Sequence, residues 1–366
     1  MDFCAAYVHN SLMSVHFLGH RRLVLAISAA LLLVGALLGV RIVRHHMSAP
    51  PATSTTQQQV PAPQHHATTH ETSKSRAVAI PGTHTIAITS GGLDRSYILH
   101  LPKGYDARKT YPVLMGFHGG FGSAQQFEAS TGLDTQADMH NFIVIYGQGT
   151  SWGRIGAPVW NAGGCCGQAV NSQKNVDDVN YVRQILKDVD DHYWIDTRRV
   201  YATGMSNGAM LAHRLACEAS DRIHGIAAVS GTIQITNCSP AQRMPILMMQ
   251  GTNDPRVLYD GGTSSGPIQI TSQPVLQIYR EWAARNGCAV ATPAVTTRVA
   301  SASSDGKSVD QIQYPGCPTP TTLYRVNGGV HEWPGGNPTN NTLEQKTPTQ
   351  AINASHTIVT FFGLDQ

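Results

Sequence analysis

The stretch that decides the fold is Val200-Tyr-Ala-Thr-Gly-Met-Ser-Asn-Gly-Ala-Met210, in which a short β-branched and aromatic run leads into the pattern G-x-S-x-G. Ser206 lies between Gly204 and Gly208, and apolar residues then continue at helical spacing. A serine held in a strained turn between a strand and a helix needs these glycines, because β-carbons there would collide with the crossing backbone. The stretch therefore predicts a strand-to-helix turn that presents a nucleophile. The alternative is an ordinary N-cap serine between glycines.

Short apolar runs and helical patterns alternate on both sides of this turn. We expect strands at residues 84–89, 96–101, 112–117, 142–146, 199–203, 226–229, 246–250, 294–299, 309–314 and 322–326. We expect helices at 175–193, 275–285 and 351–362, and a further helix that begins directly after Ser206. The first two strands alternate like an antiparallel hairpin, whereas the continuous apolar runs that follow are typical of buried parallel strands. The pattern predicts an α/β-hydrolase fold, with a mostly parallel central sheet covered by helices on both faces.

Three segments of different composition divide the 366 residues. Residues 1–44 contain an uninterrupted apolar run at 23–40 with arginines on both sides, which predicts an uncleaved signal anchor or a cleaved signal peptide. Residues 45–78 are rich in Pro, Ser, Thr and His with almost no large apolar side chains, as expected of a disordered linker. Residues 79–366 hold the alternating pattern, and we expect them to form one catalytic domain.

Charge and cysteine content bear on partners and location. Charged residues make up 13% of the chain, the net charge is +3, and no dense Lys/Arg tract is present, which argues against a nucleic-acid partner. Six of the seven cysteines lie beyond the linker, and an even number after an export signal indicates disulfides in an oxidising compartment. We therefore expect an exported protein, periplasmic or extracellular. It would be secreted, or held at the membrane by its N-terminal segment if that segment is not cleaved.

The six cysteines suggest two disulfides. Cys288 and Cys317 bracket the second expected hairpin, so their positions should meet. Cys217 ends the helix that follows the serine, and Cys238 follows the next strand and its loop, so we pair these two. Cys165-Cys166 is left over, and both a vicinal disulfide and two free thiols are open for it.

An activated serine needs a base and a carboxylate that orients the base, and in this fold they follow in the order Ser, Asp, His. Asp254 lies in the turn that leaves the buried strand at 246–250, where such a sheet presents its site residues. The alternative for Asp254 is a turn cap before the following proline. His331 lies in the glycine-rich loop 328–336, the one histidine on a loop placed to reach the serine. We predict that Ser206, Asp254 and His331 are the catalytic residues.

The stretch Phe117-His-Gly-Gly-Phe121 follows one of the expected strands. Glycines at a strand end allow backbone N–H groups to approach a substrate oxygen without β-carbons in the way. We expect an oxyanion hole made by the N–H of Asn207 and by that of Gly119, Gly120 or Phe121, with no choice made among these three.

Two tryptophans lie on loops close to the carboxyl edge of the expected sheet. Trp160 and Trp333 are candidates for contacting the acyl or aromatic part of a substrate. Simple loop packing is the alternative for each.

Six motifs occur in order: His118-Gly-Gly, Trp160-Asn-Ala-Gly-Gly-Cys-Cys-Gly167, Val176-Asp-Asp-Val179, Gly204-Met-Ser-Asn-Gly208, Gly251-Thr-Asn-Asp254 and Gly329-Val-His-Glu-Trp-Pro334. Together they resemble the esterase family that contains secreted polyhydroxybutyrate depolymerases and related feruloyl and acetylxylan esterases. The resemblance covers nearly all of residues 84–362. It implies hydrolysis of carboxylic esters through a covalent acyl-enzyme, with the triad named above. Polymer-degrading members often carry separate substrate-binding modules, and we identify none here, which argues against activity on insoluble polymer.

The sequence thus predicts an exported serine carboxylic-ester hydrolase that needs no metal or organic cofactor. One alternative is a serine peptidase of the same fold, although no gating domain and no pocket for a charged peptide group is evident. A second is a membrane-tethered binding protein on an inactive scaffold. That alternative expects a broken triad or lost oxyanion glycines, and all of these residues are present.

Overall fold

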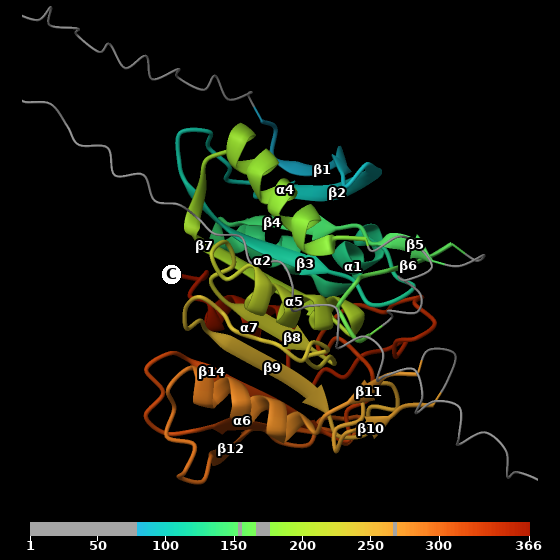
Figure 1. The fold of residues 1–366 in the computed structure, drawn as a ribbon, viewed down its shortest axis with the longest axis vertical. Helices are drawn as coiled ribbons and strands as arrows, with labels where there is room; N and C mark the ends of the chain where they lie inside the picture. Colours follow the sequence, from blue (N-terminus) through green and yellow to red (C-terminus); the bar gives the residue numbers. More distant parts are fainter. Residues whose placement is uncertain (1–78, 153–155, 166–175, 266–268) are drawn as a thin grey trace, which may run out of the picture. The chain divides into compact units, whose positions relative to one another are not determined.

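The computed structural model describes residues 79–152, 156–165, 176–265 and 269–366, which fold around a ten-stranded sheet (Figure 1). The strand order in this sheet is β1-β2-β4-β3-β7-β8-β9-β14-β13-β12. Its strands are β1 (Gly82–Ser90), β2 (Leu93–Leu101), β3 (Tyr111–Phe117), β4 (Ile143–Gly147), β7 (Ile195–Met205), β8 (Ile226–Val229), β9 (Ile246–Gly251), β12 (Val295–Ala300), β13 (Ser308–Gln313) and β14 (Thr321–Asn327). Two small hairpins pair β5 (Thr150–Trp152) with β6 (Ala157–Val159) and β10 (Gly262–Thr263) with β11 (Thr271–Ser272).

The centre of the sheet is parallel and both of its margins are antiparallel. Strands β4, β3, β7, β8, β9 and β14 run in one direction. At one margin, β1 and β2 form the expected hairpin across Gly91 and Gly92, which both adopt positive φ (59° and 75°). Glycine takes this conformation without steric cost, so the tight turn follows from these two residues. The parallel centre means that the chain leaves every central strand at the same edge of the sheet.

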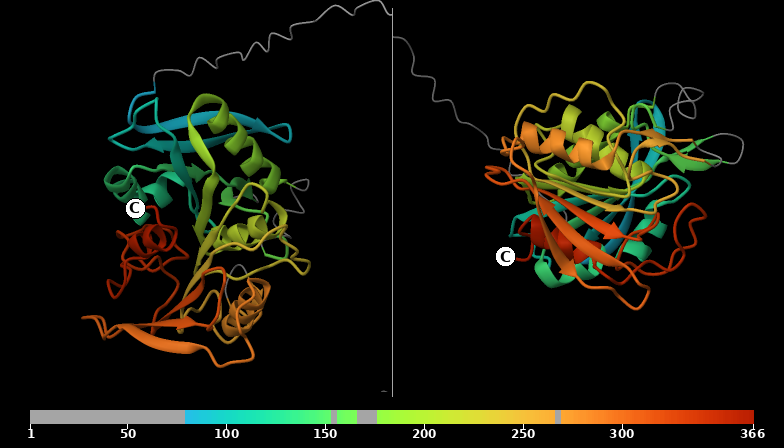
Figure 2. Two further views of the ribbon diagram at one scale, coloured as in Figure 1. Left: turned by 90° about the vertical axis from the view of Figure 1, so that its left-hand side faces the viewer. Right: turned by 90° about the horizontal axis from the view of Figure 1, so that it is seen from below.

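Helices cover both faces of the sheet (Figure 2). They are α1 (Ala124–Thr131), α2 (Leu133–His140), α4 (Asp178–His192), α5 (Asn207–Glu218), α6 (Val275–Arg285) and α7 (Ala354–Phe361). Alternate residues of a strand point to opposite faces, so Met115 of β3 belongs to the apolar layer that contains residues of α4, α5 and α6, while Leu114 belongs to the layer that contains residues of α1, α2 and α7. These two apolar layers confirm the predicted α/β-hydrolase class.

The structure departs from the expected elements in several places. Helices α1 and α2 were not expected, because each is short and buries only a few apolar side chains, too few for a clear helical pattern. The expected second hairpin, β12–β13, is present, and it extends the main sheet because β13 also pairs antiparallel with β14. Helix α4 begins at Asp178 rather than at 175. Asp177 caps its N-terminus, because its side chain accepts a hydrogen bond from the N–H of Asn180 (2.9 Å).

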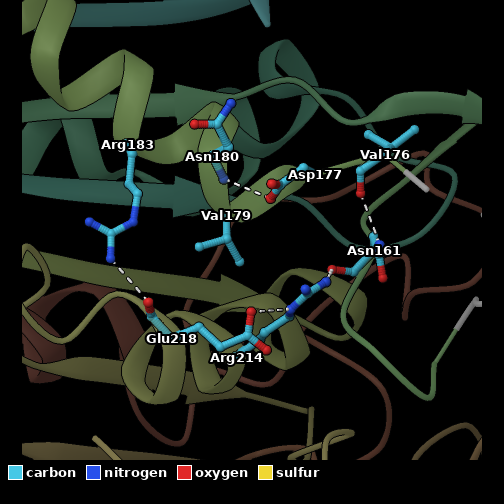
Figure 3. A pocket seen from close by; sticks show the side chains of 8 residues that line it. All are labelled: Asn161, Val176, Asp177, Val179, Asn180, Arg183, Arg214 and Glu218. Atoms are coloured by element: carbon cyan, nitrogen blue, oxygen red, sulfur yellow. Dashed lines mark hydrogen bonds and ion pairs between the residues drawn. The ribbon is translucent and has the colours of Figure 1, made fainter. Parts of the chain in front are cut away.

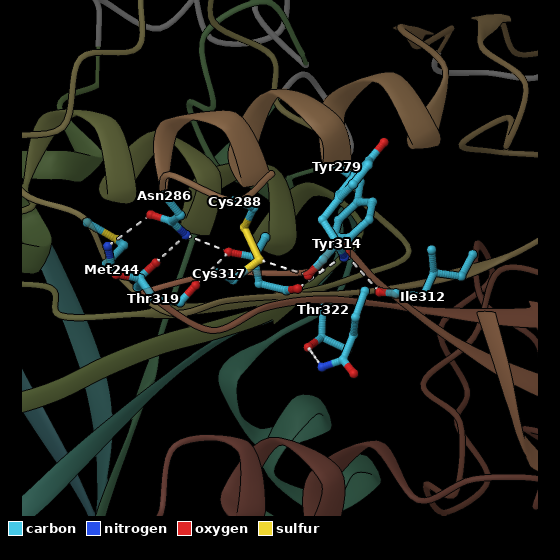
Figure 4. The surroundings of a disulfide bond; sticks show 11 residues. Met244, Tyr279, Asn286, Cys288, Ile312, Tyr314, Cys317, Thr319 and Thr322 are labelled. Carbon is cyan, nitrogen blue, oxygen red and sulfur yellow. Dashed lines mark hydrogen bonds between the residues drawn. A yellow bond between two sulfur atoms is a disulfide. The ribbon is translucent and has the colours of Figure 1, made fainter. Parts of the chain in front are cut away.

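Cys217 is joined to Cys238, and Cys288 to Cys317, in the pairing expected from the sequence. The second bond ties the end of α6 to the chain entering β14 (Figure 4). Beside it, the Asn286 amide donates to the Met244 carbonyl (2.8 Å) and to the Thr321 hydroxyl (2.7 Å). Cys165 is buried, and Cys166 lies outside the described residues.

The N-terminal predictions concern residues that the structure does not describe. The apolar run at 23–40 and the linker at 45–78 both precede the first described residue. Within the described ranges, no helix combines the length and the apolar character needed to cross a bilayer.

Candidate active site

Ser206 sits in a strained backbone turn between β7 and α5. Its φ of 54° and ψ of −120° lie in a region that non-glycine residues rarely occupy. A β-carbon at Gly208 would lie 2.0 Å from the Phe117 carbonyl oxygen, and one at Gly204 would lie 2.5 Å from the Gly208 carbonyl carbon. The Ser206 N–H donates to the carbonyl of Val229 on β8 (2.9 Å), which ties the turn to the sheet. Strand, serine and helix therefore meet in a geometry that requires both glycines.

Asp254 and His331 form a buried pair. His331 Nδ1 lies 2.8 Å from Asp254 Oδ2, and both side chains are almost completely buried. The other carboxylate oxygen accepts from the backbone N–H groups of Arg256 (2.7 Å) and Val257 (2.9 Å). The Gln250 side-chain amide donates to Oδ2 at 3.2 Å. Because Nδ1 faces a carboxylate, it carries the ring proton, and Nε2 is left as the basic nitrogen.

The sheet topology brings these groups together from distant parts of the sequence. Ser206 follows β7, Asp254 follows β9 and His331 follows β14, and these parallel strands all end at the same sheet edge. Ser206 and His331 line one small pocket at this edge. The remaining residues that line it are Gly120, Asn207, Arg256, Ile270 and Leu343.

A buried ion pair anchors the loop that carries His331. The Glu332 carboxylate lies 3.1 Å from Lys307 Nζ and accepts from the backbone N–H groups of Thr349 (2.8 Å) and Val330 (3.2 Å). Three donors on one buried carboxylate satisfy its charge and fix the residue next to the histidine. On the other side, the N–H of Gln345 donates to the His331 carbonyl (2.8 Å), so this loop is held from two directions.

His118 shapes the glycine turn after β3 rather than acting as a base. Its Nε2 accepts from the N–H of Gly149 (3.0 Å), so Nδ1 carries the proton and donates to the Gly119 carbonyl (2.7 Å). Complete burial lowers the pKa of His118 to about 4, which keeps the ring neutral. A neutral, doubly hydrogen-bonded histidine at this position fixes the Gly119 peptide beside Ser206.

The structure corrects one of the oxyanion-hole predictions. The N–H of Phe121 donates to the Pro158 carbonyl (2.8 Å), so this group is occupied and is not an oxyanion donor. Gly120 lines the pocket with Ser206, and a β-carbon at Gly119 would lie 3.4 Å from the Ser206 β-carbon. Asn207 is the first residue of α5, where backbone N–H groups have no acceptor within the helix. Gly119, Gly120 and Asn207 therefore stay as the predicted donors.

The prediction that Trp160 and Trp333 contact substrate is wrong. Trp160 is 0% exposed, and its indole N–H donates to the His118 carbonyl (2.8 Å). Trp333 is 3% exposed, lies edge-on to Phe127, and donates to the Ser355 hydroxyl (3.1 Å). Neither lines the pocket at Ser206. Both indoles satisfy their N–H inside the protein, which is the packing role of a buried tryptophan.

Glu344 lies beside the site and was not anticipated from the sequence. Its Oε1 accepts from the Asn341 side-chain amide (2.7 Å), and the same amide approaches the Gly120 carbonyl at 3.3 Å. A β-carbon at Gly119 would lie 3.1 Å from that carboxyl oxygen. Burial raises the pKa of Glu344 to about 7, while a positive charge on His331 acts in the opposite direction. No local pattern around Glu344 marks it, because its position depends on how the loop after β14 folds back.

A second pocket lies between α4 and α5, away from Ser206 (Figure 3). Its arginines are already engaged. Arg214 donates to the Asn161 carbonyl (2.9 Å) and to the Glu218 carboxylate (3.0 Å), and Arg183 donates to the Glu218 carbonyl (3.0 Å) and to Asp221 (2.8 Å). These contacts tie two helices and a loop together, so we interpret this hollow as a helix–helix junction.

The sheet order, the strained serine and the buried aspartate–histidine pair define an α/β-hydrolase. The chain belongs to the family described as esterase PHB depolymerase, whose model matches residues 95–277, half of the chain. It is accordingly a serine carboxylic-ester hydrolase, as the six sequence motifs predict.

Individual relatives agree with this family. The feruloyl esterase B of Piromyces equi is 32% identical over 202 residues, which are 53% of this chain and 36% of that protein, so the match spans about a third of its length. A probable feruloyl esterase C of Aspergillus oryzae is 26% identical over 251 residues, 66% of this chain and 78% of that protein. The acetyl xylan esterase of Aspergillus awamori superposes with a TM-score of 0.53 at 15% identity, over 77% of this chain and 99% of that one, which supports the fold.

Proposed function

We propose that this protein is an exported esterase in which Ser206 is the nucleophile, His331 the general base and Asp254 the residue that orients the base. One observation carries the proposal. Asp254 contacts His331 Nδ1, and His331 lines the same pocket as Ser206, whose backbone is strained. This is the arrangement that serine hydrolases of unrelated folds use for acyl transfer.

The chemistry follows from these contacts. His331 Nε2 takes the proton from the Ser206 hydroxyl as its oxygen attacks the ester carbonyl, and the tetrahedral oxyanion forms. Backbone N–H groups of Asn207 and of Gly119 or Gly120 stabilise this charge. Collapse of the intermediate expels the alcohol, which takes its proton from His331. Water, deprotonated by the same histidine, then attacks the acyl-enzyme and releases the acid and Ser206.

The lining of the pocket supports an ester with a short acyl group. Its lining combines backbone at Gly120 with two aliphatic side chains, Ile270 and Leu343, and it is small. Such a pocket fits a short aliphatic acyl group, for example a hydroxyalkanoate unit. A hydroxycinnamate or acetylated sugar ester is the second candidate, supported by the relatives named as feruloyl and acetylxylan esterases.

The two disulfides support export, because such bonds persist in oxidising compartments. The residues expected to direct export precede the described part of the chain. N-terminal sequencing of the protein recovered outside the cytoplasm tests this point. A mature N-terminus after residue 40 identifies a cleaved signal, whereas an intact one at the membrane identifies an anchor.

An activity panel tests the esterase proposal. It compares soluble 3-hydroxybutyrate oligomers, methyl ferulate, acetylated xylan and p-nitrophenyl butyrate, together with a peptide p-nitroanilide. We expect turnover of the aryl ester and of the hydroxybutyrate oligomers, with little cleavage of the anilide. Preferential cleavage of the anilide would instead identify a peptidase, and no turnover of any ester would overturn the proposal.

A further inference from the structure

The pocket beside Ser206 contains one residue with a permanent positive charge. Among the described residues that line it, Arg256 is the one lysine or arginine, and the others are glycine, serine, asparagine, two aliphatic residues and the histidine of the triad. A guanidinium keeps its charge at every pH at which proteins are stable. Arg256 therefore adds a permanent positive charge to the lining of the pocket that contains Ser206.

No carboxylate neutralises this cation within the described part of the chain. The Arg256 side chain makes a single long hydrogen bond there, from Nη1 to the carbonyl of Ser265 (3.5 Å). By contrast, Arg95 lies 2.9 Å from Asp178, and Arg214 lies 3.0 Å from Glu218. A guanidinium that shares a concave pocket but lacks an acidic partner can still bind an anion through two parallel hydrogen bonds.

The position of Arg256 relative to the triad is fixed by its own backbone. Its N–H donates to Asp254 Oδ1 (2.7 Å), and the other oxygen of that carboxylate receives His331 Nδ1 (2.8 Å). Both carboxylate oxygens of Asp254 thus accept hydrogen bonds from backbone N–H groups or from the imidazole, and none from the Arg256 guanidinium. The guanidinium is thus carried by a residue whose backbone supports the catalytic carboxylate and which lines the same pocket as Ser206.

We propose that Arg256 is an anion subsite that selects esters with a free carboxylate close to the scissile bond, as at the carboxyl end of a short hydroxyalkanoate oligomer. This inference rests on the proposed esterase function and narrows its substrate class. The guanidinium binds the terminal carboxylate and orients the neighbouring ester toward Ser206, and it takes no part in bond making or breaking. A neutral ester of the same shape lacks this contact.

A matched pair of substrates tests the subsite. The linear trimer of 3-hydroxybutyrate is compared with the same trimer whose terminal carboxyl is a neutral carboxamide, and cleavage of internal esters is followed by chromatography. We expect the wild-type kcat/KM ratio of acid to amide to exceed about tenfold, the typical effect of a charged hydrogen-bonded contact. Raising the ionic strength should lower this ratio, because salt screens exposed charges.

Variants assign the preference to the side chain. Arg256→Gln keeps the backbone N–H to Asp254 and removes the charge, and it should lower the acid-to-amide ratio by about tenfold or more. Arg256→Lys keeps a charge and should retain a higher ratio than Arg256→Gln. The matched control is Arg198→Gln, which removes an exposed charge on β7 roughly 25 Å along the strand from Ser206. This control should keep the wild-type ratio.

Each result bears on a separate claim. If the wild-type enzyme cleaves neither trimer nor p-nitrophenyl butyrate, the esterase proposal fails. If it cleaves the aryl ester but does not prefer the trimer acid, the anion subsite is wrong and the esterase stands. An unchanged acid-to-amide ratio in Arg256→Gln would also overturn the role of Arg256.

Discussion

Replacing Glu344 by glutamine should change how the stability of this protein depends on pH. The wild-type carboxyl lies partly buried beside the oxyanion loop, and its desolvation raises its pKa from 4.5 to about 7. Between pH 4.5 and about pH 7, Glu344 holds a proton in the folded protein that it has released in the unfolded chain. The free energy of unfolding of the wild type therefore falls as pH rises through this interval, and the contribution of Glu344 is fully lost above the folded pKa.

The size of this effect follows from the two pKa values. Each unit of difference between the folded and the unfolded pKa corresponds to about 1.4 kcal/mol in the free energy of unfolding. Moving from 4.5 to about 7 makes the ionised side chain cost about 3 kcal/mol at pH 8. Glutamine cannot ionise and has nearly the same shape. The stability of Glu344→Gln relative to wild type should therefore rise by about 3 kcal/mol between pH 4.5 and pH 8.

Urea unfolding at a series of pH values, with the disulfides intact, measures this difference. The matched control is Glu281→Gln on α6, whose carboxyl is 39% exposed and pairs with Arg285. Its stability should follow the wild-type curve, because an exposed carboxyl loses little hydration on folding. If the free energy of unfolding of wild type and of Glu344→Gln changed with pH in parallel, the claim that folding raises the pKa of Glu344 would be refuted.

Two further predictions concern the triad and the serine turn. Asp254→Asn should lower kcat for p-nitrophenyl butyrate by about a thousandfold or more, because an amide N–H facing His331 favours the wrong tautomer; a loss below tenfold would argue against Asp254. Gly208→Ala should destabilise the fold by roughly 3 kcal/mol or more, since its β-carbon would lie 2.0 Å from the Phe117 oxygen. Gly120→Ala is the control, with its nearest β-carbon contact at 3.9 Å. Equal melting temperatures for these two variants would contradict the packing described around Ser206.

The parts of the site that depend on local rules could be predicted from the sequence. The turn at Ser206 requires glycines at fixed offsets, and that requirement is visible in five letters. Asp254 and His331 could be placed because each follows an apolar run long enough to identify a parallel strand, and parallel strands end at one edge. The same reasoning places the glycine turn that begins at Gly119.

The parts that depend on contacts between distant segments could not be predicted. Trp160 and Trp333 lie on loops near the site, but their burial is set by Tyr181, Phe127 and other side chains far away in the sequence. The N–H of Phe121 is lost to a carbonyl on β6. The surroundings of Glu344 likewise depend on how one loop folds over another, a property that hydrophobic periodicity does not encode.

The central claim is that Ser206 forms a covalent acyl-enzyme, and labelling with a fluorophosphonate tests it most directly. Mass spectrometry of the treated protein should find one adduct, on the peptide containing Ser206, with loss of esterase activity in proportion to labelling. Ser206→Ala should take up no label and should lose activity on p-nitrophenyl butyrate. Full activity in Ser206→Ala, or an adduct on another residue that accounts for the inhibition, would contradict the account.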